Sequence, residues 1–468
     1  MKQPNQWILL MSTPIVSFMS TIDASIVNIA VPKMSRDLHI LNNQAEWVVS
    51  VYLVTICVLL ILFGRLSDQI GRVRLFQIGT LIFVTGSLFC GLSVNLPTIL
   101  ASRMLQALGA SMTMATNFGI ITDIFPPSRH GLALGVNSSF VQVGNIAGPG
   151  IGGLILSVLN WHYIFFINVP IGIIAYFLGH HFFPRAKRHV GRPAIDVPGY
   201  LTYAAMIISF FLMIFWGQVI GFGHWKILCL AGLTLALIIA FALIERRQSK
   251  PLIDLRIFHN LGFSFGIISA MLVYMCGYFN NVIMPFYLQD RLQLSAGITG
   301  LILMAVPIVN VFSAPVGGTI SDHIGAEKIS FFALFIFLVP EIIFILVTPQ
   351  WSLLWLVIGL AFFGCANGAF QNNPMIMGNA GKEFHRIAGS IAALGRNLGM
   401  SIGLALATTL LYHGISLRAG YRMTTFPDAH PDWFVWGMHY AYAFALGLIV
   451  VAIGILGVVL RRKASRTS

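Results

Sequence analysis

The chain has 468 residues, of which 57% are hydrophobic and only 9% are charged, with a mean hydropathy of +0.84. A water-soluble globule of this size needs more polar surface, so the composition excludes a soluble protein and indicates a polytopic membrane protein. The formal net charge of +13 does not indicate nucleic-acid binding, because the basic residues gather in alternate loops.

Fourteen apolar runs are long enough to cross a bilayer of about 30 Å, which takes about 20 residues per helix. They lack the alternation of barrel strands, so all fourteen are expected to be helices. No small-residue cleavage site precedes the second run, so the first is expected to be a retained helix. The runs cover approximately residues 8–31, 46–64, 75–94, 97–121, 131–156, 162–183, 199–218, 225–244, 262–286, 296–317, 329–348, 352–376, 387–412 and 437–460.

The distribution of basic residues predicts the orientation of these spans. When alternate loops are assigned to opposite sides, 20 of the 28 Lys and Arg residues fall on one side and six on the other. Arg103 and Arg396 lie inside spans. By the positive-inside rule the richer side is cytoplasmic, so we expect a multi-pass protein of the cell membrane with both termini in the cytoplasm.

An internal repeat predicts two related halves. GRLSDQIGRVR at Gly64–Arg74 is echoed in register by GTISDHIGAEK at Gly318–Lys328, 254 residues later. The first six and the last six runs are separated by about the same offset. The expected organisation is therefore a six-helix half at 1–183, an insertion of two helices with basic linkers at 184–261, and a second six-helix half at 262–468.

The repeated stretch is interpreted as a charged turn that latches the cytoplasmic side. Asp68 can accept hydrogen bonds from a helix N-terminus, and the nearby arginines can bind carboxylates or lipid phosphates. A basic loop alone is usually a topology signal, but the echo favours a structural latch. The latch residues are Gly64, Asp68, Gly71, Arg72, Arg74 and Asp322.

Two charges inside the first half are candidates for proton coupling. Asp23 lies in the outer half of the first run and Arg103 near the outer end of the fourth, both at a depth of roughly 10 Å. An intramembrane charge is costly and suggests a functional site. The alternatives are a first helix that ends early and leaves Asp23 in water, and a static brace between the two side chains. Glu341 is the other acid in the middle of a span and ranks below Asp23.

Glycine spacing in the fifth run indicates close helix packing at a kink. In GNIAGPGIGG the residues Gly144, Gly148 and Gly152 share one helix face, followed by Gly153, and Pro149 removes a backbone donor. A gate between helices needs such a contact.

Uncharged and basic polar groups inside other spans either line a substrate cavity or join helices together. The sequence does not decide between these two roles. The candidates are Asn28, Gln106, Asn280, Asn281, Asn310, Asn367, Gln371, Asn372 and Arg396.

No cofactor is indicated. The sequence has no GxxxxGK[ST] phosphate loop, so energy is expected from an ion gradient rather than ATP. The five cysteines lie in apolar runs and the histidines lack metal-ligand spacing, so neither disulfides nor a metal site is expected. No nucleophile and base can be paired within one span or loop, which argues against an enzyme.

These motifs resemble the fourteen-span DHA2 family of drug:proton antiporters in the major facilitator superfamily, over nearly the whole chain. Asp23, Val27, Asn28, Ala30 and Pro32 match the first-span pattern, Arg103 and Gln106 the fourth, and GxxxGPxxGG is complete. Val73 and Ala107 depart from the usual residues. The resemblance implies the major facilitator fold, proton coupling through Asp23 and Arg103, a latch at Asp68 and Arg72, and an antiporter helix at Gly148 and Pro149.

The resulting hypothesis is a proton-coupled exporter of small amphipathic compounds that works by alternating access, with protons and membrane lipids as its other partners. A dedicated metabolite or amino-acid exporter, or an uptake transporter of the same fold, is the alternative. A membrane sensor that has lost transport is a third possibility, and the intact Asp23, Arg103 and GNIAGPGIGG argue against it.

Overall fold

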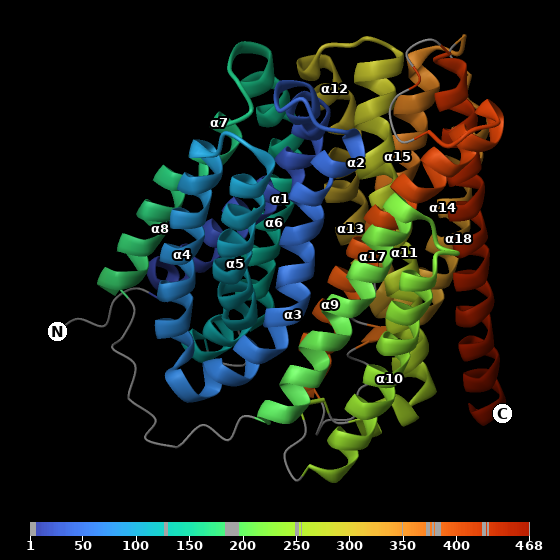
Figure 1. Ribbon diagram of the computed structural model, residues 1–468. Helices are drawn as coiled ribbons and strands as arrows, with labels where there is room; N and C mark the ends of the chain where they lie inside the picture. The colour runs from blue at the N-terminus through green and yellow to red at the C-terminus, as the bar shows by residue number, and fades with distance from the viewer. Residues whose placement is uncertain are drawn as a thin grey trace. The chain divides into compact units, whose positions relative to one another are not determined.

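The computed structural model describes residues 6–125, 130–182, 196–248, 252–253, 255–348, 350–370, 375–376, 379, 385–423, 427 and 430–467. Every regular element in these ranges is a helix (Figure 1). In a bilayer a helix satisfies its backbone hydrogen bonds within one segment, which is why long apolar runs fold this way.

The helices follow the chain in the order expected from the apolar runs. The first part contains α1 (Gln6–Asp37), α2 (Asn42–Ala45), α3 (Trp47–Ile70), α4 (Arg72–Leu92), α5 (Leu96–Ile124), α6 (His130–Val158), α7 (Tyr163–Phe166), α8 (Asn168–Phe182), α9 (Val197–Ile220) and α10 (Trp225–Arg247). The second contains η2 (Leu255–His259), α11 (Leu261–Phe286), the π-helical η3 (Tyr287–Arg291), α12 (Ala296–Leu303), α13 (Ala305–Ile324), α14 (Ala326–Leu346), α15 (Leu353–Ala369), α17 (His385–Ala419) and α18 (Asp432–Thr467).

Twelve helices among the described residues are long and apolar enough to cross a membrane, and α15 is a shorter apolar helix. The remaining expected run, 97–121, lies within α5, a helix of 29 residues. The expected all-helical membrane fold is therefore confirmed. The expected run at 296–317 lies in the span Ala296–Ser321, which consists of α12, ending at Leu303, and α13, beginning at Ala305, with Met304 between them in helical conformation.

The helices group into two compact units. Unit 1 comprises Met1–Val27, Trp47–Gly148 and Leu159–Leu255, and unit 2 comprises Asn28–Glu46, Pro149–Val158 and Arg256–Ser468. In unit 1, α5 packs against α3 and α4, and α9 packs against α3 and α10. In unit 2, α11, α17 and α18 pack together and α14 contacts α15 and α18. Unit 2 thus includes one end of α1 and one end of α6.

Polar contacts join the C-terminal end of α1 to other segments of unit 2. Arg36 forms an ion pair with Asp290 in η3. Gln289 donates a hydrogen bond of 3.2 Å to the carbonyl of Ile29, and Lys33 donates one of 2.9 Å to the carbonyl of Leu156 in α6.

Candidate functional site

Asp23 lies in the middle of α1 and its exposed fraction is 0%. Since α1 continues to Asp37, the alternative of a helix that ends early and leaves Asp23 in water is wrong. A buried carboxylate needs compensating partners, because removing its water without them is very costly.

Arg103 of α5 is the principal partner of this carboxylate. Its Nη1 lies 2.7 Å from Asp23 Oδ2, and both side chains are almost completely buried. The ion pair that similar depth predicts is therefore present. The Arg103 guanidinium also donates through Nε to the carbonyl of Val48 at 3.0 Å and lies 4.1 Å from the centre of the Tyr52 ring.

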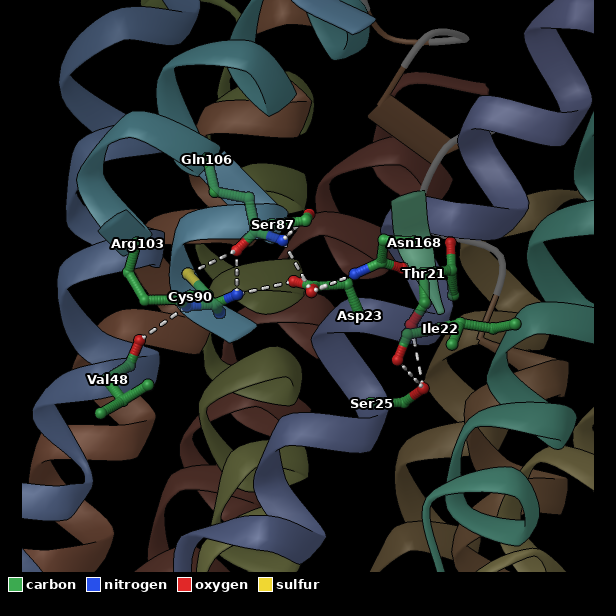
Figure 2. A network of polar contacts seen from close by, with 10 residues as sticks. All are labelled: Thr21, Ile22, Asp23, Ser25, Val48, Ser87, Cys90, Arg103, Gln106 and Asn168. Carbon is green, nitrogen blue, oxygen red and sulfur yellow. Dashed lines mark hydrogen bonds and ion pairs between the residues drawn. The ribbon is translucent and has the colours of Figure 1, made fainter. Parts of the chain in front are cut away.

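Two amides complete the shell of the carboxylate (Figure 2). Gln106 Nε2 and Asn168 Nδ2 each donate to Asp23 Oδ1 at 2.8 Å. Gln106 also bridges the pair, because its Oε1 accepts from Arg103 Nη1 at 2.5 Å. Its Nε2 donates to Ser87 Oγ of α4 at 2.7 Å. The network joins α1, α3, α4, α5 and α8 within unit 1.

The sequence at the start of α5 fixes where the helix begins, and with it the positions of Arg103 and Gln106. Asn95 caps the helix by accepting from the Thr98 backbone at 3.0 Å, and Pro97 follows in the first turn, where its missing N–H is not needed. At Gly86 an added Cβ would lie 2.5 Å from the backbone nitrogen of Gln106. Only a glycine in α4 lets α5 approach this closely.

Each member of the ion pair has further partners. Three donors face the carboxylate of Asp23. Besides Asp23, Arg103 contacts the Val48 carbonyl, Gln106 Oε1 and the Tyr52 ring. These contacts offset part of the cost of burying the two charges.

The repeated motif is helical rather than a turn, which corrects the interpretation of Gly64–Arg74 as a charged turn. Gly64 and Asp68 lie in α3, and the break is confined to Gly71 (φ 97°), after which α4 begins. Gly325 (φ 93°) makes the same break between α13 and α14. Positive φ at both positions explains why each copy needs its second glycine.

The partners of the motif differ between the copies. Arg72 donates through Nη1 to both carboxylate oxygens of Asp123 in α5 at 3.0 Å. In the second copy Glu327 accepts from Asn379 Nδ2 at 2.9 Å instead. Arg74 is exposed, and the side chains of Asp68 and Asp322 lie outside the described structure.

The glycines of α6 meet different neighbours along the helix. In unit 1, an added Cβ at Gly144 would lie 3.0 Å from the carbonyl of Phe18, and one at Gly148 would collide with Ser25 Oγ. In unit 2, the Pro149 carbonyl occupies the space beside Gly300, and a Cβ at Gly153 would lie 2.7 Å from the Ala296 carbonyl. Gly152 is buried. Close backbone packing at these glycines agrees with the spacing argument.

Of the remaining candidates, Gln106 contacts Asp23. Glu341 in α14 and Asn280 in α11 are buried in unit 2. Asn28 and Asn310 are also buried. The others vary: Asn367 and Arg396 are half-buried, Asn281 is exposed, and Gln371 and Asn372 lie outside the described residues.

Sequence reasoning missed Asn168, Ser87 and Tyr52. The signal for Asn168 was available, since it is a polar residue enclosed in the apolar stretch FINVP. Ser87 and Tyr52 carry no such signal, because serine and tyrosine are common in apolar helices. Among the described residues, no group of three or more His, Cys, Asp or Glu side chains is placed to hold a metal ion.

Solved structures of transporters share this fold. A peptide transporter POT in complex with sulfate aligns with a TM-score of 0.68, covering 96% of this chain and 94% of the other at 16% identity. A bacterial homologue of the human lysosomal transporter Spinster, in an inward-facing and unoccupied conformation, aligns with a TM-score of 0.66, covering 97% of each chain at 15% identity. At such identities the similarity concerns the fold alone.

Closer relatives are found by sequence. The riboflavin transporter RibZ of Clostridioides difficile (strain 630) is 33% identical over 100% of both chains. The uncharacterized transporter YebQ of Escherichia coli (strain K12) is 30% identical, covering 87% of this chain and 90% of YebQ. Multidrug resistance protein 3 of Bacillus subtilis (strain 168) is 27% identical, covering 84% and 77%.

The family model of the Major Facilitator Superfamily matches residues 15–404 and 266–468. Together with the relatives and the shared fold, this match establishes a multi-pass membrane transporter rather than an enzyme. The chain belongs to the Major Facilitator Superfamily.

Proposed function

We propose that this transporter is a proton-coupled exporter of small amphipathic compounds, with Asp23 as the proton acceptor. The observation that carries the proposal is the buried Asp23–Arg103 pair bridged by Gln106. A charge pair this deep in an apolar bundle is expensive, and it is retained most readily where the charge is used.

In the proposed cycle, protonation of Asp23 weakens its ion pair, and Arg103 keeps its hydrogen bonds to the Val48 carbonyl and Gln106 Oε1. Because the network links five helices of unit 1, this change alters how those helices pack. Alternating access would then expose the substrate-binding site to opposite sides of the membrane in turn. Loss of the proton to the cytoplasm would restore the ion pair.

The direction of transport in this proposal depends on orientation. The excess of Lys and Arg on one side supports cytoplasmic termini. Protons would enter from outside and drive substrate outwards. Two relatives named as export proteins support export: the tetracenomycin C resistance and export protein of Streptomyces glaucescens and the multidrug export protein EmrB of Haemophilus influenzae, which is 27% identical over 66% of this chain.

A second candidate is a dedicated transporter of one metabolite, working in either direction. It is favoured by the riboflavin transporter RibZ, whose similarity extends over the whole of both chains. Riboflavin is therefore the first defined substrate to test, beside lipophilic cationic dyes.

The test uses purified protein in liposomes with an imposed pH gradient, recording lumenal pH while riboflavin or a dye is added. Asp23→Asn should abolish proton movement coupled to the transported compound and reduce its gradient-driven accumulation at least tenfold. The matched control is Asp37→Asn in the same helix, since Asp37 is exposed and its change should have no effect.

Gradient-driven transport that survives Asp23→Asn in full would overturn the assignment of Asp23. Transport of riboflavin alone, with no dye moved, would favour the dedicated transporter over the exporter of many compounds.

A further inference from the structure

Glu341 is a completely buried acid in α14 of unit 2, with an exposed fraction of 0%. Neither carboxyl oxygen has a hydrogen-bond partner among the described residues. The ion pairs found in the described parts of the chain do not include it. Its surroundings are therefore the opposite of those of Asp23.

Two polar groups that interact with Glu341 donate their own protons to other acceptors. Tyr442 and Cys276 interact electrostatically with the carboxyl group. The Tyr442 hydroxyl, however, donates to Asn280 Oδ1 at 2.8 Å, and the Cys276 thiol donates to the carbonyl of Ala445 at 3.5 Å. Neither donor remains for Glu341. The Nδ2 of Asn280, which is itself buried, also lacks a partner among the described residues.

These surroundings suit a neutral carboxylic acid and not a carboxylate. Moving an isolated carboxylate from water into an apolar interior costs tens of kcal/mol in the limit of no compensation, whereas a neutral polar group costs roughly 2–7 kcal/mol. Tyrosine and cysteine are themselves uncharged near neutral pH. Packing of this kind therefore favours Glu341 with its proton over the carboxylate.

The acid also lies next to a weak point of its helix. Pro340, directly before Glu341, lacks an N–H group, so the carbonyl of Ile336 cannot receive the usual helical hydrogen bond from residue 340. Pro285 interrupts α11 in the same way, one turn beyond Asn280. Helices bend at such positions, and a bend here would let water reach the carboxyl group.

We propose that Glu341 is a second proton-binding site, in unit 2, which carries an exchangeable proton as a neutral carboxylic acid close to Tyr442 and Cys276. The proton binds to a carboxylate oxygen when water reaches the site and returns to water when it leaves. The inference deepens the proposed proton-coupled function and rests on it for its meaning, because a transporter with one acid in each half can move more than one proton per cycle.

Infrared spectroscopy of the full-length protein in lipid bilayers tests the site without any substrate. The wild type should show a carbonyl stretching band of a protonated carboxylic acid that disappears in Glu341→Gln. Transfer into D2O should shift the band if its proton exchanges. The matched control is Glu327→Gln in the same helix, since Glu327 accepts a hydrogen bond from Asn379 and its replacement should leave the band in place.

Two results would overturn the proposal. The absence of a band that depends on Glu341 would mean that the side chain is ionised. A band that never shifts in D2O would mean that the acid is structural and does not exchange its proton. If Glu341→Gln does not fold, Glu341→Asp supplies the assignment, because the band should move rather than vanish. Since no substrate is involved, a failure of coupling at Asp23 would not change any of these outcomes.

Discussion

Asp23 and Glu341 are both buried at 0% exposure in the helical bundle, yet their environments have little in common. Asp23 receives hydrogen bonds from Arg103, Gln106 and Asn168, whereas Glu341 receives none from the described residues. A paired carboxylate can stay charged in a membrane, and an isolated one is stable only with its proton. The comparison shows that depth alone does not define the charge of an intramembrane acid.

The largest expected effect comes from removing the cation beside Asp23. Arg103→Gln leaves a buried carboxylate without its counter-ion and should destabilise the protein by about 3–5 kcal/mol. Adding Asp23→Asn should restore most of the lost stability, because two amides need no charge balance. It should not restore transport. Thermal unfolding in detergent measures both variants. If Arg103→Gln alone were as stable as the wild type, Asp23 would not depend on its counter-ion, and its contrast with Glu341 would be wrong.

Glu46 is a buried acid whose surroundings are intermediate between those of Asp23 and Glu341. It lies just before the membrane span of α3, is buried, and accepts a hydrogen bond from the Thr408 hydroxyl, all within unit 2. Burial raises the pKa of Glu46 to about 8 from an ordinary value of 4.5, against the opposing effect of Thr408.

The folded protein therefore keeps this proton to higher pH than the unfolded chain does. Its contribution to stability is complete below about pH 4.5 and is lost as the pH rises to about 8, by at most about 1.4 kcal/mol per pH unit. Glu46→Gln should flatten this part of the stability profile. Unfolding midpoints at pH 5, 6, 7 and 8 provide the check, and equal slopes for variant and wild type would contradict it.

Two glycines, one packed against the Asp23 network and one in the helix that carries Asn280, should respond differently to an added methyl group. Gly86→Ala places a Cβ 2.5 Å from the backbone of Gln106 and should cost about 1–3 kcal/mol while disturbing the shell of Asp23. Gly277→Ala, in the helix that carries Asn280, meets only Phe363 at 3.5 Å and should be close to neutral. The unfolding midpoints of the two variants test this difference. A larger loss of stability in Gly277→Ala than in Gly86→Ala would refute it.

The smallest expected effect concerns the outer edge of the Asp23 network. Ser87→Ala removes the acceptor for Gln106 Nε2 and should cost about 1 kcal/mol, with a modest fall in transport. Thr85→Ala in the same helix is the control, because Thr85 is exposed and bonds only to its own helix through the Leu81 carbonyl. Equal effects of the two changes would place Ser87 outside the functional network.

Sequence patterns alone predicted the helices and the repeat, and they placed Asp23 and Arg103 at a similar depth, where they could pair. Run length and hydropathy are local properties, and a helix satisfies its own backbone, so its position needs no knowledge of neighbours. Gly71 and Gly325 could be matched from the sequence because a repeated motif is also a local pattern. The depth of a charge within its own helix was enough to expect that Asp23 and Arg103 meet.

Which buried groups have partners, and which side chains those partners are, depends on the tertiary structure. Asn168 is 145 residues from Asp23 in the chain yet donates to it, and the donors beside Glu341 are directed to Asn280 and Ala445. A polar side chain in a span signals that a partner is needed, but the identity of the partner depends on which helices pack together. That choice is made by side-chain packing between distant segments, which local patterns do not specify.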